Sequence, residues 1–122
     1  MEKVGNNKLM LISKYERYMG YMIKLIYILP RTEKFSIGNE YKLSMYKSME
    51  NILYLNKVAA NKLVYVNKVD TELMLQRILL RIMKNEKWIS EQKFNVAMKM
   101  MYEIGKIVGG LTKYYENNTK YV

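Results

Sequence analysis

The sequence predicts an all-α protein, an antiparallel up-down four-helix bundle. One proline and six glycines among 122 residues leave little material for the tight turns of a β-protein. Apolar residues recur at alternating steps of three and four through most of the chain, which is typical of helices with one buried face. The length fits one domain, so we expect residues 1–122 to form a single bundle.

The first predicted helix covers about residues 7–29 and ends before the only proline, Pro30. The residue before a proline avoids the α-helical region, so a helix stops there. Ser36 is the candidate N-cap of a second helix over about residues 36–60, because its hydroxyl can accept a hydrogen bond from the first turn. The two apolar stripes are Ile12, Tyr15, Met19, Met22, Ile26 and Leu29, then Ile37, Tyr41, Met45, Ser48, Ile52, Leu55 and Ala59.

A third helix is predicted over about residues 67–85, after a turn in which Asn61 and Asn67 are weak helix breakers. From Val69 to Met83, nine of fifteen residues are apolar, and they cover most of the helix circumference. Such a helix is usually buried on more than one side. In so small a domain we expect the second side to pack against another subunit, which predicts a homo-oligomer; its ring-like or barrel-like form is an expectation from the resemblance described below.

The fourth predicted helix covers about residues 90–115, with Ser90 as its N-cap, and residues 116–122 are expected to form a flexible tail. Three glycines fall inside its apolar pattern, and each interior glycine costs a helix about 1 kcal/mol relative to alanine. Close approach of a neighbouring helix and fraying both account for them, and both interpretations are open. The stripe is Phe94, Ala97, Met101, Ile104, Val108 and Leu111, and the glycines are Gly105, Gly109 and Gly110.

The composition favours an anionic partner and gives little support to catalysis. A net charge of +10 is spread over the whole chain, which suits nucleic acid or an anionic membrane surface. Without histidine or cysteine there is little material for acid–base or metal chemistry, so we expect no enzyme activity, no metal and no cofactor. Charged residues interrupt the apolar stretch 9–30, so we expect no membrane span and a cytoplasmic location.

Three segments carry a resemblance to a known family: "LPRTEKFSIGNEYKLSMYKSMENIL" (29–53), "DTELMLQRILLRIM" (70–83) and "ISEQKFNVAMKMMYEIGKIVGG" (89–110). They are similar to the accessory variability determinants of diversity-generating retroelements. These belong to a wider group of four-helix bundles that includes proteins encoded in intervening sequences of 23S ribosomal RNA genes. In the latter, Ala-Glu-Gly is expected after Asn51 and Ile52, where this chain has Leu53. One departure from the retroelement pattern is Leu111, where a tryptophan is expected.

The resemblance implies a non-enzymatic accessory protein. Members of the family assemble as basic, barrel-shaped homopentamers and associate with a reverse transcriptase and its template RNA, in support of mutagenic retrohoming. We therefore expect three partners: the reverse transcriptase of the same element, template RNA or its complementary DNA, and further copies of this chain. Two alternatives stay open. One is an intervening-sequence-type bundle, structural or RNA-associated; the other is a basic bundle acting at an anionic membrane.

Ten basic residues are candidates for the contact with nucleic acid or a partner. Arg77, Arg81 and Lys84 share a ridge of the third predicted helix with Asp70, within roughly 60° on a helical wheel. Arginine suits phosphate better than lysine does. In the alternative interpretation, Asp70 or Glu72 pairs with the arginines in a ridge that seals the oligomer. The other candidates are Arg31 and Lys34 in the first link, Lys42 and Lys47 on the second helix, and Lys99, Lys106 and Lys113 on the fourth.

Each of these lysines is individually compatible with a solvated surface position as well. The lone tryptophan, Trp88, falls in the turn before the fourth predicted helix. It suits stacking on a base, anchoring a partner or capping the end of the bundle.

Overall fold

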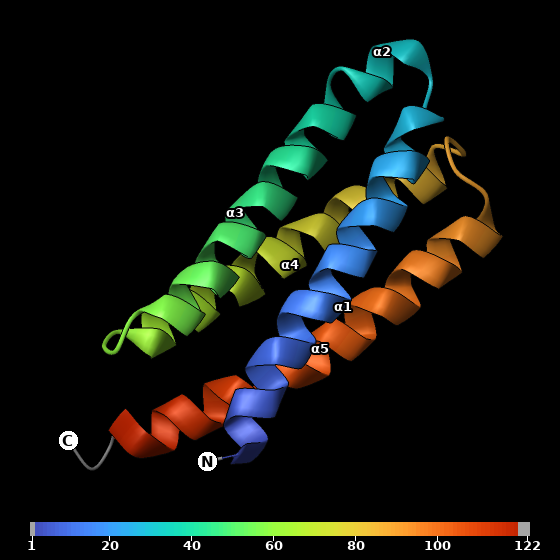
Figure 1. Ribbon diagram of the computed structural model, residues 1–122. Coiled ribbons are helices and arrows are strands. Elements are labelled where there is room, and N and C mark those ends of the chain that lie inside the picture. Colours follow the sequence, from blue (N-terminus) through green and yellow to red (C-terminus); the bar gives the residue numbers. More distant parts are fainter. Residues whose placement is uncertain (1, 120–122) are drawn as a thin grey trace.

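Four long helices make up the part of the chain that the structure describes. The computed structural model describes the backbone of residues 2–119 and the side chains of residues 7–118. The helices are α1 (Glu2–Tyr27), α3 (Ile37–Lys57), α4 (Lys62–Asn85) and α5 (Glu91–Thr119), and a single-turn helix, α2 (Arg31–Lys34), joins α1 to α3. Contacts link α1 with α3, α3 with α4, α4 with α5, and α5 with α1 (Figure 1). Successive long helices are therefore antiparallel neighbours, and the predicted up-down four-helix bundle is confirmed.

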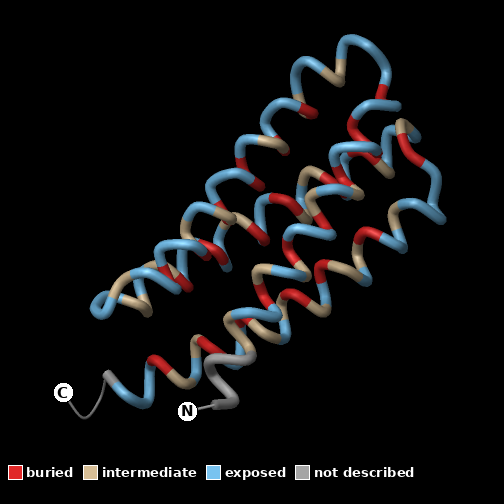
Figure 2. The backbone as a smooth tube through the Cα atoms, in the orientation of Figure 1, coloured by how far each residue is buried: buried red, intermediate tan, exposed pale blue. Residues whose placement is uncertain are grey.

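The core lies along the bundle axis, where each helix turns one face inward (Figure 2). The predicted stripe of α5 is buried from Ala97 to Leu111, and that of α3 from Tyr41 to Leu55. Of the six residues of the first predicted stripe, four are buried, and at the other two positions the preceding residue lies in the core instead. The side chains of Leu11 and Tyr18 are fully buried, whereas the expected Ile12 and Met19 pack at the edge of the core.

The turn between α3 and α4 lies earlier than predicted. Asn61 adopts a left-handed conformation with a φ of 63°, which asparagine tolerates better than most residues. The chain reverses at this residue, so α4 begins at Lys62 and not near residue 67. Val66 then becomes a fully buried core residue in the second turn of α4.

Helix α5 continues beyond its predicted end at residue 115. Tyr115 extends the apolar stripe by one further step of four and is only 7% exposed, so the last turns of α5 remain packed on the bundle. Residues 116–119 are helical, so α5 extends into the segment for which a flexible tail was predicted. Residues 120–122 lie outside the described part of the chain.

The predicted N-caps have different outcomes. The Ser90 Oγ accepts a hydrogen bond from the Lys93 N–H at 3.2 Å, which confirms this cap. Ser36 stands at the N-cap position of α3 but makes no capping hydrogen bond. Its hydroxyl donates instead to the Thr32 carbonyl oxygen at 3.2 Å, because the short helix α2 brings that acceptor within reach.

The end of α4 is closed by hydrogen bonds without a glycine. Lys87 has a φ of 63°, and its N–H donates to the Lys84 carbonyl at 2.9 Å. The next N–H, that of Trp88, donates to the Met83 carbonyl at 2.9 Å. This pair of bonds defines a Schellman motif. Trp88 packs against the core at this point, which favours its interpretation as a cap of the bundle end.

A buried polar network holds α1, α3 and α4 together around Gln76, which has no exposed surface. Its side-chain oxygen accepts hydrogen bonds from the hydroxyls of Tyr18 at 2.8 Å and Tyr15 at 3.2 Å. Its amide nitrogen donates to Ser44 Oγ at 2.9 Å and Ser48 Oγ at 3.2 Å. Every bonding position of the amide is used, so the rotation of α4 about its own axis is fixed.

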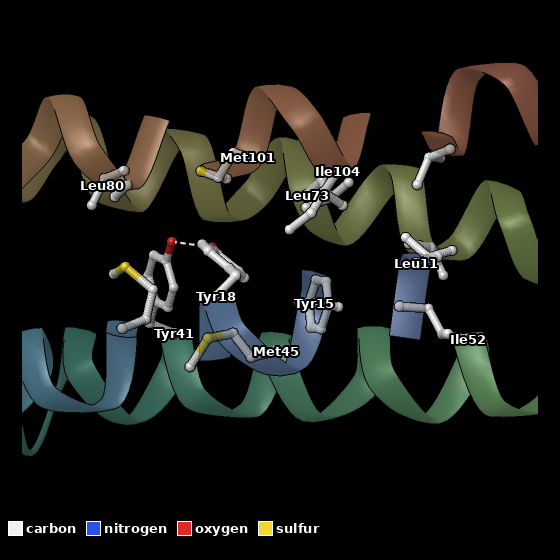
Figure 3. Packing of buried hydrophobic residues seen from close by; sticks show 14 of the residues in the cluster. Leu11, Tyr15, Tyr18, Tyr41, Met45, Ile52, Leu73, Leu80, Met101 and Ile104 are labelled. Atoms are coloured by element: carbon white, nitrogen blue, oxygen red, sulfur yellow. Dashed lines mark hydrogen bonds between the residues drawn. The ribbon is translucent and has the colours of Figure 1, made fainter. Parts of the chain in front are cut away.

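The tyrosines of this network stay protonated at neutral pH. The Tyr18 and Tyr41 hydroxyls share a hydrogen bond in the middle of the core (Figure 3). Burial raises the pKa of Tyr15 to about 12, and burial likewise raises the pKa of Tyr18 and of Tyr41 above the ordinary value for tyrosine. The network therefore carries no negative charge into the core.

Candidate nucleic-acid interface

Arg77 and Lys106 line one surface depression between α4 and α5. Its volume is about 340 Å³, and its other lining residues are Asp70, Met98, Tyr102 and Gly105. Arg77 directly follows the buried Gln76, so fixing Gln76 in the core turns Arg77 by one helical step toward α5. The polar network thus positions the arginine, and α5 supplies the lysine and the aromatic ring.

Gly105 provides the space that the Arg77 side chain occupies. A Cβ added at Gly105 would lie 3.2 Å from Arg77 Nη2, closer than most side-chain contacts. A Cβ at Gly109 or Gly110 would meet no atom of a neighbouring element within 4 Å. Of the two interpretations, close approach therefore applies to Gly105 alone, and the neighbour there is the Arg77 side chain. Gly109 and Gly110 face open space. All three lie within continuous helix, so α5 is not frayed there.

An aromatic ring stands beside the two cations. The Lys106 Nζ lies 5.1 Å from the centroid of the Tyr102 ring, which is 65% exposed. A base could stack on such a ring while the lysine and Arg77 contact phosphate. Tyr102 was not among the contact residues predicted from the sequence. The spacing in the sequence could have indicated this residue, because Tyr102 falls within roughly 60° of three exposed lysines on the helical wheel of α5. These lysines are Lys99, Lys106 and Lys113.

The two arginines of the α4 ridge differ from its lysine in their partners. Lys84 forms an ion pair with Glu91 at 3.9 Å and lies 4.7 Å from the Phe94 ring centroid. A second ion pair joins Lys14 to Glu103. Among the side chains that the structure describes, neither Arg77 nor Arg81 forms an ion pair.

The two carboxylates that were expected as alternative partners of the arginines form no ion pair with them within the described residues. Glu72 accepts a hydrogen bond from Ser44 Oγ at 2.7 Å. Asp70 lines the depression with Arg77 but forms no ion pair within the described residues. Among the described residues, no ion pair therefore neutralises the two arginines of the ridge. This leaves the arginine charge available to a ligand or to another subunit.

The remaining candidates are dispersed over the molecule. Lys34 lies 4.4 Å from the Tyr27 ring centroid at one end of the bundle, next to the exposed Arg31. Lys42 is half-buried on α3, and Lys47 lies at the α3–α4 boundary beside Glu72. The structure thus brings together Arg77 and Lys106, with Lys99 and Lys113 exposed on the same stripe of α5.

Helix α4 also carries an exposed apolar face. Val64, Leu75, Ile78 and Ile82 lie within roughly 60° of one another on the helical wheel. Each is at least 40% exposed. Across the described residues, no helix is long and apolar enough to cross a membrane, and no group of acidic side chains is arranged to hold a metal ion.

Comparison with known proteins adds one finding to this geometry. A family model described as bAvd-like matches residues 9–115. The chain belongs to the bAvd-like family. The match spans the whole core of the bundle and includes the depression between α4 and α5. No curated protein matches the chain.

Residues from two of the segments that carried the family resemblance, 29–53 and 89–110, pack the core of this bAvd-like chain. Leu29 is buried, and a Cβ at Gly38 would lie 2.8 Å from the Ile26 Cγ2 atom, so the residue at this crossing of α1 and α3 must be small. Leu111, where a tryptophan was expected, is 1% exposed and fills the core near the end of α5. The departure at Leu111 is therefore a change of core packing.

Proposed function

We propose that this protein is a non-catalytic accessory factor of a diversity-generating retroelement. In this role it binds the reverse transcriptase of the element and its template RNA, and it supports mutagenic retrohoming. The match to the bAvd-like family over residues 9–115 carries the proposal. The basic surface supports it, because a net charge of +10 suits a phosphate backbone and contributes affinity with little sequence preference.

The depression between α4 and α5 is the proposed contact with nucleic acid. Arg77 offers a planar fork that matches phosphate, and Lys106 adds a second cation on the facing helix. Tyr102 offers a stacking surface to an unpaired base. Template RNA with single-stranded segments suits this arrangement of two cations and an exposed ring.

The exposed apolar face of α4 supports assembly into a homo-oligomer. The side chains of Leu75, Ile78 and Ile82 would leave water on association with another copy of the chain. Oligomerisation would also repeat the basic depression around the assembly. Several depressions on one particle would bind one RNA more tightly than a single depression does.

Co-purification tests the proposed partners. The tagged protein is expressed with the reverse transcriptase encoded beside it and the candidate template RNA, and washed at about 0.3 M salt, where exposed charges are strongly screened. Retention of the polymerase in a fixed ratio is the expected result. Loss of the polymerase while RNA is retained would remove the adaptor role and favour an RNA-associated bundle.

Salt titration of RNA binding tests the depression itself. For Arg77→Gln and Lys106→Gln we expect the slope of log affinity against log salt to fall by about one unit for each lost phosphate contact. Arg17→Gln, at an exposed position of α1, is the matched control and should leave the slope unchanged. Equal effects of Arg17→Gln and Arg77→Gln would show diffuse attraction without a defined contact.

A further inference from the structure

The α3–α4 turn and the last turns of α5 lie at the same end of the bundle (Figure 1). Residues of both segments line a second pocket. We call it the bundle-end pocket. It is formed by the turn residues 59–64 together with Tyr114, Tyr115 and Asn118, and its volume is about 670 Å³. This volume is in the range of pockets that hold small organic ligands. Leu63, Val64 and the tyrosines give it an apolar and aromatic wall.

Two lysines from different helices lie beside Tyr115: Lys62 lines the pocket, and Lys8 lies next to the Tyr115 ring outside the pocket lining. The Nζ of Lys62, in α4, lies 5.9 Å from the centroid of the Tyr115 ring, and the Nζ of Lys8, in α1, lies 6.0 Å from it. Burial and the neighbouring Lys62 lower the pKa of Lys8 to about 8. Within the described residues neither lysine takes part in an ion pair. The fold therefore places two cations together without a compensating anion among those residues.

The start of α4 adds a third favourable feature for an anion. Asn61 makes no side-chain hydrogen bond to the first turn, so that turn has no side-chain cap. Uncapped N–H groups and the positive end of a helix dipole stabilise negative charge. The lysines, which come from separate helices, and the aromatic wall distinguish this pocket from an ordinary helix start.

We propose that the bundle-end pocket binds a nucleoside phosphomonoester, either as a free mononucleotide or as the phosphorylated end of a nucleic-acid strand. A phosphomonoester carries a charge of about −1.5 to −2 near pH 7, which matches two lysines, whereas an internal phosphodiester carries one charge. The base would pack against Tyr114 and the apolar wall, because aromatic rings stack on bases of any identity. This site is separate from the depression between α4 and α5 and does not rest on the proposed function.

The ring geometry supports a rigid binding wall. Tyr114 and Tyr115 pack edge to face with their centroids 5.5 Å apart, so each ring limits the movement of the other. An aromatic wall that is already positioned loses little conformational entropy when a ligand binds.

Calorimetric titration of the intact protein at about pH 7, below the pKa of about 8 of Lys8, tests the proposal. The probes are adenosine monophosphate, adenosine and inorganic phosphate. The variants are Lys62→Gln and Lys8→Gln, with Lys24→Gln on α1, at the opposite end of the bundle, as the charge-matched control. Thermal unfolding followed by circular dichroism verifies that each variant is folded.

Adenosine monophosphate should bind, with adenosine and phosphate each at least about tenfold weaker. Each pocket variant should weaken the nucleotide about tenfold, the scale of one charge-assisted hydrogen bond, and Lys24→Gln should leave it unchanged. No binding at millimolar nucleotide, equal binding of adenosine, equal binding of inorganic phosphate, or an equal loss in Lys24→Gln would each overturn the proposal.

Oligonucleotides with a 5′-phosphate or a 5′-hydroxyl separate the two sources of the ligand. Tighter binding of the phosphorylated strand, lost in Lys62→Gln, identifies a strand end. Equal binding of the two strands, with the mononucleotide still bound, identifies a free nucleotide. Arg77→Gln should leave nucleotide binding unchanged, which keeps this test independent of the proposed RNA contact between α4 and α5.

Discussion

Gly105 faces the guanidinium of Arg77 so closely that a β-carbon at residue 105 would lie 3.2 Å from Nη2. The atom it would meet is the far end of a flexible side chain, which can move by a few tenths of an ångström. The glycine therefore sets where the charge of Arg77 lies, at the expense of helix stability in α5.

Replacing Gly105 by alanine should separate stability from binding. We expect Gly105→Ala to raise the free energy of unfolding by up to about 1 kcal/mol, because alanine favours the helix. RNA affinity should fall about threefold as the guanidinium shifts from its phosphate contact. Chemical unfolding and filter binding measure the two effects. Gly110→Ala, which meets no neighbouring atom, should raise stability without the loss of affinity.

Replacing Gly38 by alanine should destabilise the bundle. The new Cβ would lie 2.8 Å from Ile26 Cγ2, so α1 and α3 must separate or repack, at about 1–3 kcal/mol. Urea unfolding measures this loss. The same change at Gly20, where a Cβ meets nothing within 4 Å, should stabilise α1 by about 1 kcal/mol. Similar effects at the two glycines would show that the crossing of α1 and α3 is looser than the structure describes.

Replacing Gln76 by leucine should cost about 2–4 kcal/mol of unfolding free energy. The hydroxyls of Tyr15 and Ser48 lose the amide as a partner while they remain buried. Denaturant titration measures the loss. Gln92→Leu makes the same chemical change at an exposed position and should alter stability by less than about 0.5 kcal/mol. A neutral Gln76→Leu variant would mean that the network adds specificity without adding stability.

The buried tyrosines predict a loss of stability at alkaline pH. The pKa of Tyr15 is raised from 10 when unfolded to about 12 when folded, so its contribution is complete below pH 10 and is lost as the pH rises toward 12. For this one tyrosine the loss is about 2 kcal/mol between these pH values. Unfolding at a series of pH values measures it. Tyr15→Phe should show a shallower decline; an identical decline would assign the effect to other groups.

A charge on the apolar face of α4 should disperse the proposed oligomer. Ile78 is 47% exposed in the protomer, so Ile78→Lys is compatible with a folded bundle but would bury a charge between subunits. Sedimentation velocity should show smaller species for this variant, with unchanged helix content by circular dichroism. Ile23→Lys, at a 39% exposed position of α1, is the control and should retain the assembly. An intact oligomer in Ile78→Lys would place the interface elsewhere.

The sequence by itself determined the four helices and most of their buried residues. Apolar steps of three and four fix which face of a helix can leave water, and Pro30 and Ser90 mark boundaries through local backbone chemistry. The basic charge and the family resemblance also lie in the sequence. The buried faces and the helix boundaries depend on neighbours within about one or two helical turns, which is why they can be predicted from the sequence of one chain.

Tertiary structure decided what depends on residues far apart in the chain. In α1 apolar residues are adjacent at 18 and 19, and the hydrogen bond of Tyr18 to the buried Gln76 selects Tyr18 for the core. Arg77 and Lys106 come from different helices and line the same depression. Lys8 and Lys62 also come from different helices, and both lie near the Tyr115 ring. Helical periodicity gives the face of each residue but not the height or rotation of one helix against another. Packing and the buried hydrogen bonds set those two quantities, and with them both candidate sites.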